Sequence, residues 1–435
     1  MRGPRWAVKR WAVIGIAVAA VLAATGLVGY RVFRPGELVD AAKSSYPSTA
    51  AVAQPMVYGT LLATPLLVDL RLRVYAAKRD VYADTPVDVK SSLSHFWSYR
   101  RWPAQVTGVV AVGATVVSLW SDGAVVALNA AKGDVVWRAD VPQPSGTGFT
   151  GRRTGAATVY QPRNLLTAGS TVIVVGTQGT TAFAGPTGRQ LWHLPPTKCQ
   201  NAPTVSTGNA SAPPAGAATA SPADGAGPAV DDPGGFTTFT TPTAFVAVDT
   251  CGTPATTAVD AGTGEPRDWP QADLRPLGCA TGQSMCSGVV ATDGHGWTVG
   301  DDGTLTPARG LTTPATWLVD GVAVRQLPEG SVEGRRASDN SPLWTSDAGT
   351  VVAVETGAVH LMSPEHRELV TLDPSDGSVL SRFPFVVKDS GPFDVGRVFA
   401  ADRFLFIERA RPGATSDQPD GAYFYPSPNV VVAGS

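Results

Sequence analysis

Short apolar runs separated by turn residues recur along most of the chain after residue 55. In one such unit, the run 115–120 is mostly β-branched and apolar, as expected of a strand that is covered on both sides. Asp122 and Gly123 then form a two-residue hairpin turn, because glycine tolerates a positive φ. Residues 124–138 supply a return strand, a longer turn that ends in glycine, and a third strand. The pattern predicts antiparallel sheet.

This unit is repeated along the chain. Residues 109–138 align with residues 165–193, weaker copies follow at 245–269, 318–344 and 351–383, and the segments 288–305 and 395–407 look like further, still weaker copies. The copies keep turn residues and an aromatic residue in the third strand, which together form the structural repeat: Asp122, Gly123, Asn129, Gly133, Trp137, Gly179, Gly188, Trp192, Asp260, Gly264, Trp269, Gly330, Trp344, Asp373, Gly377 and Phe383. Repeats of this length indicate a fold whose units stack on one another.

Three or four antiparallel strands per copy predict an all-β fold, a β-propeller of about seven blades (six to eight possible) over residues 55–435. Residues 429–434 are expected to be a last strand that completes the first blade and closes the ring. Residues 201–235 are nearly all small, polar or proline residues and predict a disordered insert, because they cannot bury enough apolar surface. Residues 411–421 predict a second exposed loop.

The N-terminus predicts a membrane anchor. Residues 11–30 contain no charge, and that length spans a hydrocarbon core of about 30 Å as a helix. Four basic residues precede this run and two follow it, which predicts a cytoplasmic tail at 1–10, a transmembrane signal-anchor at 11–30 and an extracytoplasmic remainder that begins with a spacer at 31–54. A cleaved signal peptide is the alternative, with Val21 and Ala23 before the cleavage site.

Composition adds two constraints. The formal net charge is −2, but all charged residues of 1–34 are basic, so the remainder of the chain is acidic. An acidic body argues against a nucleic-acid partner, which requires clustered lysine and arginine. The 47 glycines and 36 prolines suit many tight turns and argue against helical bundles and coiled coils.

The four cysteines, Cys199, Cys251, Cys279 and Cys286, all lie in the exported part. An even number in an oxidising compartment predicts two disulfides, for which three connectivities are possible. We favour Cys279–Cys286, which closes a short loop, and therefore Cys199–Cys251, which ties the ends of the insert. The alternative is a zinc site, against which the absence of a C-x-x-C pair speaks.

The string DGAVVALNAAKGDVVW, residues 122–137, resembles the repeat of PQQ-like (quinoprotein-type) propellers. The resemblance implies that Trp137 and Trp192 pack at blade–blade contacts beside the turn glycines Gly133 and Gly188. Residues 74–113 also look like membrane-anchored PQQ-like repeat proteins of actinobacteria, most of which have no assigned activity. The resemblance therefore implies a fold and leaves the activity open.

The chemistry of a quinone site is not predicted. Quinoprotein dehydrogenases of this architecture typically carry two adjacent cysteines, and none are adjacent here, so we expect no cofactor. The sequence contains no H-E-x-x-H, G-x-S-x-G or phosphate-loop motif, and we expect no catalytic or metal-binding residue. The five histidines, of which His360 and His366 are nearest in sequence, are scattered: His95, His193, His295, His360 and His366.

Two local features allow a functional interpretation. The aromatic and basic run HFWSYRRW, residues 95–102, is either a recognition patch with stacked arginines or a strand that buries Trp97 and Trp102 with its arginines at the rim; we favour the strand. Asp301 and Asp302 before Gly303 lack the spacing of a calcium loop and predict an ordinary hairpin turn.

The sequence thus predicts a non-catalytic, membrane-anchored extracytoplasmic β-propeller that acts as a scaffold or binding module for a protein or cell-envelope ligand. The alternative is an extracytoplasmic enzyme, either a diverged quinoprotein dehydrogenase or a hydrolase that uses a carboxylate in the propeller channel. An enzyme requires charged side chains that converge at the channel mouth.

Overall fold

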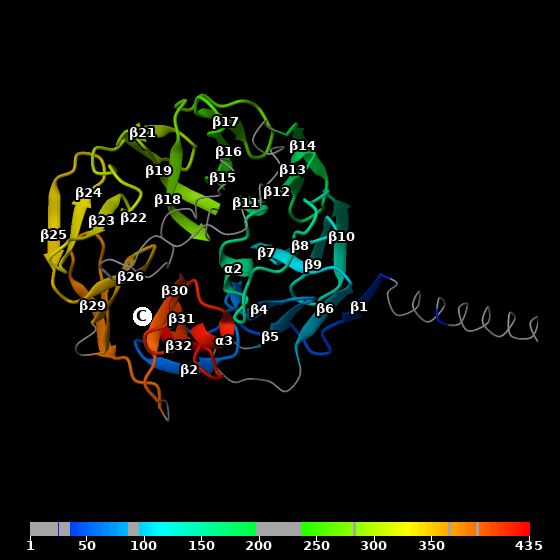
Figure 1. Ribbon diagram of the computed structural model, residues 1–435, viewed down its shortest axis with the longest axis horizontal. Coiled ribbons are helices and arrows are strands. Elements are labelled where there is room, and N and C mark those ends of the chain that lie inside the picture. Colours follow the sequence, from blue (N-terminus) through cyan, green and yellow to red (C-terminus); the bar gives the residue numbers. More distant parts are fainter. Residues whose placement is uncertain are drawn as a thin grey trace, which may run out of the picture.

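The computed structural model describes residues 25, 35–85, 95–196, 236–281, 284–363, 367–388 and 391–435. Within these ranges the strands form eight antiparallel sheets, which follow one another around a ring as the blades of a propeller (Figure 1). The prediction of an all-β propeller is confirmed, and the expected number of about seven blades is corrected to eight.

The eight blades follow chain order. Blade 1 contains β3 (Leu66–Val68), β4 (Leu72–Ala77), β5 (Asp80–Asp84) and β6 (Trp97–Trp102), and blade 2 contains β7 (Val106–Val112), β8 (Thr115–Trp120), β9 (Ala124–Asn129) and β10 (Val135–Asp140). Blade 3 contains β11 (Leu165–Ala168), β12 (Thr171–Gly176), β13 (Gly179–Ala184) and β14 (Gln190–Leu194). Blade 4 contains β15 (Phe236–Thr240), β16 (Ala244–Asp249) and β17 (Ala255–Asp260).

Blade 5 contains β18 (Leu274–Thr281), β19 (Ser284–Ala291), β20 (Gly296–Val299) and β21 (Leu305–Pro307), and blade 6 contains β22 (Trp317–Val319), β23 (Val322–Gln326), β24 (Val332–Arg336) and β25 (Pro342–Ser346). Blade 7 contains β26 (Thr350–Glu355), β27 (Ala358–Ser363), β28 (Glu368–Leu372) and β29 (Val379–Pro384). Blade 8 contains β30 (Asp394–Ala401), β31 (Phe404–Ala410), β32 (Val430–Gly434) and β2 (Val57–Leu61). Two short helices, α2 (Ala156–Tyr160) and α3 (Asp420–Tyr423), lie between strands.

The ring is closed in blade 8. Strand β32 pairs with β2, which comes from the beginning of the chain, with Leu61 opposite Val430. The expectation that the last strand completes the first blade is corrected, because an early strand completes the last one. Either arrangement removes exposed sheet edges by joining the two ends of the chain.

Part of the segment expected as a spacer belongs to the propeller. Residues 36–40 form β1 (Gly36–Asp40), a fifth strand on the outside of blade 1 that pairs with β6. Glu37 fixes this strand, because its carboxylate lies 2.7 Å from Arg138 of blade 2 and 3.2 Å from Arg101 of β6. The strand β1 therefore contacts both blade 1 and blade 2.

Tryptophans join successive blades. In four blades the indole N–H donates to a backbone carbonyl of the next blade at 2.7–2.9 Å, and the ring covers a turn glycine there; the pairs are Trp97 with Ala130 and Gly133, Trp137 with Gly185 and Gly188, Trp192 with Ala261 and Gly264, and Trp344 with Pro374 and Gly377. A Cβ at Gly188 would lie 2.5 Å from Trp137, which leaves no room for a side chain. Each such contact, which we call a tryptophan–glycine dock, requires a glycine opposite the tryptophan.

Among the described residues blade 4 has three strands, and its outer edge is covered by a side chain. Pro266 and Pro270 interrupt the place of a fourth strand, because proline has no N–H to donate to a sheet. Gln271 compensates, since its amide accepts from the Thr256 N–H at 3.1 Å and donates to the Thr256 carbonyl at 3.0 Å. The amide group thus replaces a backbone pairing partner.

The predicted Cys279–Cys286 disulfide is confirmed, and it joins opposite positions of β18 and β19. Cys251 is also disulfide-bonded, and the partner predicted for it, Cys199, lies outside the described residues. The predicted insert 201–235 likewise lies outside them.

Among the residues that the structure describes, no helix is long and apolar enough to cross a bilayer. The predicted span 11–30 lies outside these residues, apart from Thr25.

Candidate binding surface

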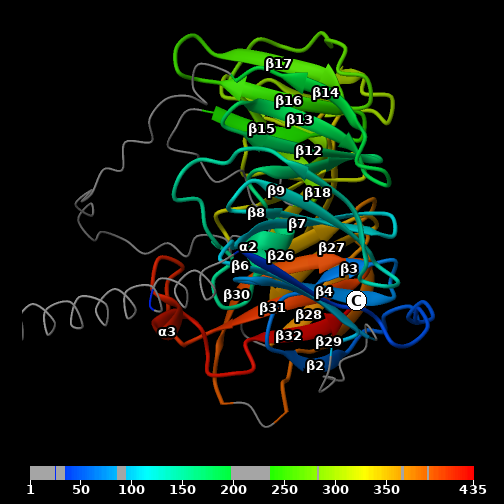
Figure 2. The ribbon, with the colours of Figure 1, turned by 90° about the vertical axis from the view of Figure 1, so that its right-hand side faces the viewer.

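Two long connections between strands of the described chain each contain a short helix. Loop 141–164 joins blade 2 to blade 3 and contains α2, and loop 411–429 joins β31 to β32 and contains α3. By comparison, β8 and β9 are joined by residues 121–123. The two helices lie on the same side of the propeller (Figure 2). Long ordered connections are usually functional or serve to hold functional segments.

Arg152 joins the two loops. Its Nε donates to Asp420 at 2.8 Å, its Nη1 to the Ser416 carbonyl at 3.0 Å and its Nη2 to the Gln418 carbonyl at 2.6 Å. The guanidinium carbon also lies 4.5 Å from the centre of the Tyr423 ring. The planar fork of arginine suits this arrangement, because all three nitrogen groups find an acceptor.

The base of loop 411–429 is held by a second arginine. Arg409 donates to the Pro428 carbonyl at 2.8 Å and stacks on Tyr425, with 4.0 Å between the guanidinium carbon and the ring centre. The amide of Asn429 donates to the Tyr425 carbonyl at 2.7 Å. The loop is therefore anchored at its base by Arg409 and at its tip by Arg152.

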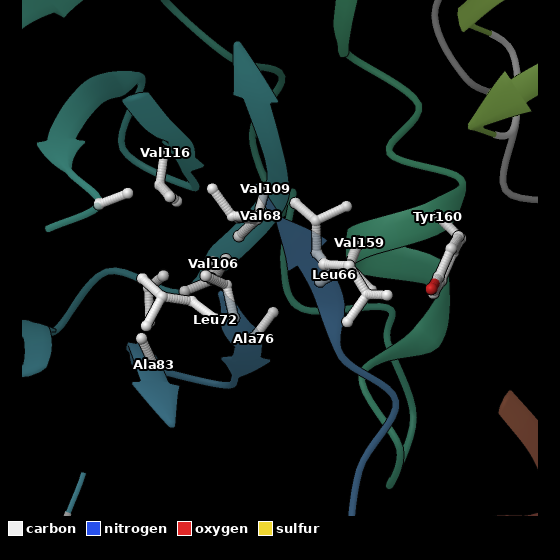
Figure 3. Close-up of a cluster of buried hydrophobic side chains, with 14 of the residues drawn as sticks. Leu66, Val68, Leu72, Ala76, Ala83, Val106, Val109, Val116, Val159 and Tyr160 are labelled. Atoms are coloured by element: carbon white, nitrogen blue, oxygen red, sulfur yellow. The ribbon is translucent and has the colours of Figure 1, made fainter. Parts of the chain in front are cut away.

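Loop 141–164 reaches into the ring and contacts blades 1 and 8. Val159 lies beside Leu66 of β3 in the buried cluster that blades 1, 2 and 8 share (Figure 3). The Tyr160 hydroxyl donates to the Pro65 carbonyl at 2.9 Å, and its ring stacks on Phe399 of β30 with centroids 4.7 Å apart. Burial raises the pKa of Tyr160 well above its usual range. The loop thus covers the seam between the first and last blades.

A buried carboxylate supports the same seam. Glu408 of β31 has no exposed surface, and its carboxylate accepts from Arg397 Nε at 3.0 Å and from the Thr154 hydroxyl. A buried carboxylate is costly unless it is paired and hydrogen-bonded, and here both conditions are met. Its acceptor positions are engaged in holding loop 141–164 against blade 8.

A second group of ionisable residues lies in turns at the other face. Because antiparallel strands alternate in direction, the turns after the first strand of each blade lie opposite those after the second. Glu355 ends β26, Asp402 follows β30, and the Arg403 N–H donates to Glu355 at 3.1 Å. Burial and the neighbouring Glu355 charge raise the pKa of Asp402. The buried His360 lies 3.2 Å from Glu355 and 3.1 Å from the Thr371 hydroxyl.

The run 95–102 divides into a buried and an exposed part. Trp97 is buried, as the strand interpretation expects, but Trp102 is 37% exposed and Arg79 lies 3.7 Å above its ring. Arg100 is exposed and pairs with Asp80 at 3.0 Å. His95 pairs with Asp84 at 3.0 Å and packs on Tyr82. The strand interpretation thus holds for Trp97 and Arg100 and is wrong for Trp102.

The acidic and amide residues of the repeat cap their own turns. Asn129 accepts from the Ala131 N–H, Asp260 from Gly262, and Asp373 from Ser375, all at 2.8–2.9 Å. Asp302 accepts from the Thr304 N–H at 2.9 Å in the expected hairpin. These side chains therefore act locally, in the backbone of the turns. Trp269, a further repeat position, is buried beside Phe239 with ring centroids 6.1 Å apart.

The sequence did not point to Arg152, Arg397 or Glu408. Arg152 lies in a loop without periodicity, so its partners could not be inferred. A signal existed for Glu408, because it is the one acid within the apolar strand-like run FLFIERA, residues 404–410. A lone charge inside a buried strand indicates a partner elsewhere in the fold.

Residues 48–226 match the family model described as outer membrane protein assembly factor BamB. This match covers less than half of the chain, and it agrees with the resemblance of residues 122–137 to the repeat of PQQ-like propellers. No curated protein matches it.

Solved structures with a similar chain course include BamB from Moraxella catarrhalis, with 13% identity, a TM-score of 0.43 and coverage of 89% of this chain and 100% of that one. The computationally designed Ika8 protein has 14% identity, a TM-score of 0.44 and coverage of 87% and 100%. The dihydro-heme d1 dehydrogenase NirN has 14% identity, a TM-score of 0.42 and coverage of 83% and 76%. These likenesses are weak, and the propeller assignment rests on the strand pairing of this chain.

Proposed function

We propose that this protein is a non-catalytic binding module of the cell envelope. In this proposal residues 11–30 anchor it in the cytoplasmic membrane, and the propeller outside presents loops 141–164 and 411–429 to a protein partner. The observation that carries the proposal is the contact between the two loops through Arg152. Long connections that are held rigid on a stable scaffold are typical of binding surfaces.

The surface that these loops present is polar and mixed in charge. Thr150, Arg153 and Asp417 are exposed, and the prolines of both loops restrict the loop backbones. A rigid surface loses less conformational entropy when a partner binds. The match of residues 48–226 to a family named for an assembly factor supports a protein partner rather than a small substrate.

Site-specific crosslinking in intact cells tests the proposal. A photo-reactive residue is placed at Thr150, Arg153 or Asp417, and at Asp339 and Asp376 in turns away from these loops as controls. We expect one recurrent protein adduct from the three loop positions and none from the two controls. Equal adducts from both sets of positions, or none from the loops, would contradict a binding surface at the loops. Protease accessibility in whole cells tests the anchor and its orientation separately.

An extracytoplasmic enzyme is the second candidate. The observation that favours it is the pair Glu355 and Asp402, since a carboxyl with a raised pKa beside a second carboxylate is suited to proton transfer. Purified protein supplied with a quinone, Ca²⁺ and an alcohol or sugar tests a dehydrogenase, and chromogenic esters and glycosides test a hydrolase. Turnover that Asp402→Asn abolishes would favour the enzyme over the binding module.

A further inference from the structure

A hollow of about 310 Å³ lies between blades 2 and 3, away from the loop contact of Arg152. One wall is the end of β10 with Val141 and Pro142, and the other is formed by β13 and β14. Neighbouring blades of the ring supply the two walls (Figure 1). Its volume is at the lower end of the range for small-molecule sites, which suits a ligand of one ring.

The walls are fixed by the packing of the two blades. Phe183 of β13 lines the hollow and stacks on Trp137 of β10, with ring centroids 5.8 Å apart. Trp137 is itself held by its hydrogen bond of 2.7 Å to the Gly185 carbonyl. The hollow is therefore built by the same tryptophan contact that joins the blades, and it is formed before any ligand binds.

Polar side chains line the hollow. Gln178 and Gln190 are exposed, and neither side-chain amide has a hydrogen-bond partner among the described residues. His193 is held by Thr181, whose hydroxyl lies 3.0 Å from the imidazole Nδ1, and this leaves Nε2 for another group. Two amides and an imidazole offer both donors and acceptors at one place.

We propose that this hollow binds a neutral carbohydrate ring. The amides of Gln178 and Gln190 match hydroxyl groups, because each amide both donates and accepts a hydrogen bond. Val141, Pro142 and Phe183 supply an apolar wall for the C–H face of the ring. Asp140 also lines the hollow, and its negative charge disfavours phosphorylated or acidic sugars.

This site goes beyond the proposed function. Val141 and Pro142 are the first residues of loop 141–164, but the polar residues Gln178, Gln190 and His193 come from blade 3, and the site involves neither Arg152 nor Asp420. A protein partner at the loops and a sugar at the rim can be present together. If one of these two ligands fails to bind, binding of the other can still be tested.

Saturation-transfer NMR on the full-length protein tests the proposal, with the methyl glycosides of glucose, galactose, mannose and N-acetylglucosamine as probes. We expect transfer to at least one glycoside. Gln190→Ala and His193→Ala should each weaken its binding about three- to tenfold, as expected for the loss of one hydrogen bond. Arg189→Ala is the matched control, since Arg189 is exposed beside Gln190 but does not line the hollow, and it should leave binding unchanged.

Three results would overturn the proposal. The first is the absence of transfer to all four glycosides. The second is binding that Gln190→Ala and His193→Ala leave unchanged. The third is a tetra-alanine peptide that displaces a bound glycoside and whose own binding Gln190→Ala weakens, which would make the hollow a peptide site.

Discussion

The guanidinium of Arg152 lies 2.8 Å from the carboxylate of Asp420, although 268 residues separate them in the chain. The contact joins loop 141–164, which connects blades 2 and 3, to loop 411–429 of blade 8. It lies over the seam at which the ring closes, so it links the shape of the loop surface to the integrity of the ring.

Replacing Arg152 by alanine should release loop 411–429. The side chain is 22% exposed and loses three hydrogen bonds, one of them to a charged group, so we expect a loss of about 2 kcal/mol in the free energy of unfolding. Limited proteolysis should cut loop 411–429 faster, and urea unfolding should report the destabilisation. Arg163→Ala is the control, because Arg163 is exposed in the same loop 141–164, and it should stay within about 0.5 kcal/mol of the wild type. Equal effects of the two changes would contradict the role of Arg152.

Gly188→Ala should disrupt the dock of Trp137. The new Cβ would lie 2.5 Å from the indole, and the residue has φ +68°, so overpacking and backbone strain add to about 3 kcal/mol or more. Gly357→Ala separates the two effects, since Gly357 has φ +74° but nothing within 4 Å of the added Cβ. Thermal unfolding should show a clearly larger fall in Tm for Gly188→Ala. Equal falls would mean that strain alone is responsible.

The ion pairs of Glu37 with Arg101 and Arg138 should make the stability of the fold depend on pH. Partial burial raises the pKa of Glu37, but the hydrogen bond from Arg138 and the charges of Arg138 and Arg101 outweigh it and lower the pKa below its usual value of 4.5. A lowered carboxyl pKa contributes stability that is present above the unfolded-state pKa and is lost as the pH falls through the folded-state pKa. Glu37→Gln should therefore lower Tm at about pH 7, and this effect should shrink as the pH falls below the usual value of 4.5. A difference in Tm that persists in acid would contradict this assignment.

The disulfide in blade 5 should make a moderate contribution. Cys279 and Cys286 are 7 residues apart, and closing so short a loop stabilises the folded chain by about 2 kcal/mol on the chain-entropy estimate. The double variant Cys279→Ser, Cys286→Ser should unfold at lower urea concentration yet keep its far-UV circular dichroism. Loss of the β-sheet spectrum would show that blade 5 depends on this bond to fold.

The repeat predicted the blades where turns and tryptophans keep their spacing. Blade 1 has no recognised sequence copy, because residues 85–96 separate β5 from β6 where other blades have a short glycine turn. Trp97 consequently stands outside the expected spacing, although it docks on Gly133 as the other tryptophans dock on their glycines. The count of about seven blades is one short for this reason.

Residues at the edges of the ring were less predictable. Alternation cannot show whether a strand end is covered, so the pattern predicts a buried Trp102 where the structure has an exposed one. The sequence did not predict strand β1, because its segment contains no copy of the repeat. The position of β1 depends on the ion pair between Glu37 and Arg138 of another blade.

The sequence by itself determined the repeating blade, since hairpin turns and the tryptophan–glycine dock depend on residues within one or two copies of the repeat. Only the tertiary structure decided how the ring closes, which loops meet over the seam and where a hollow forms between blades. These features join residues far apart in the chain, such as Arg152 and Asp420 or Leu61 and Val430, and no local pattern encodes such partners.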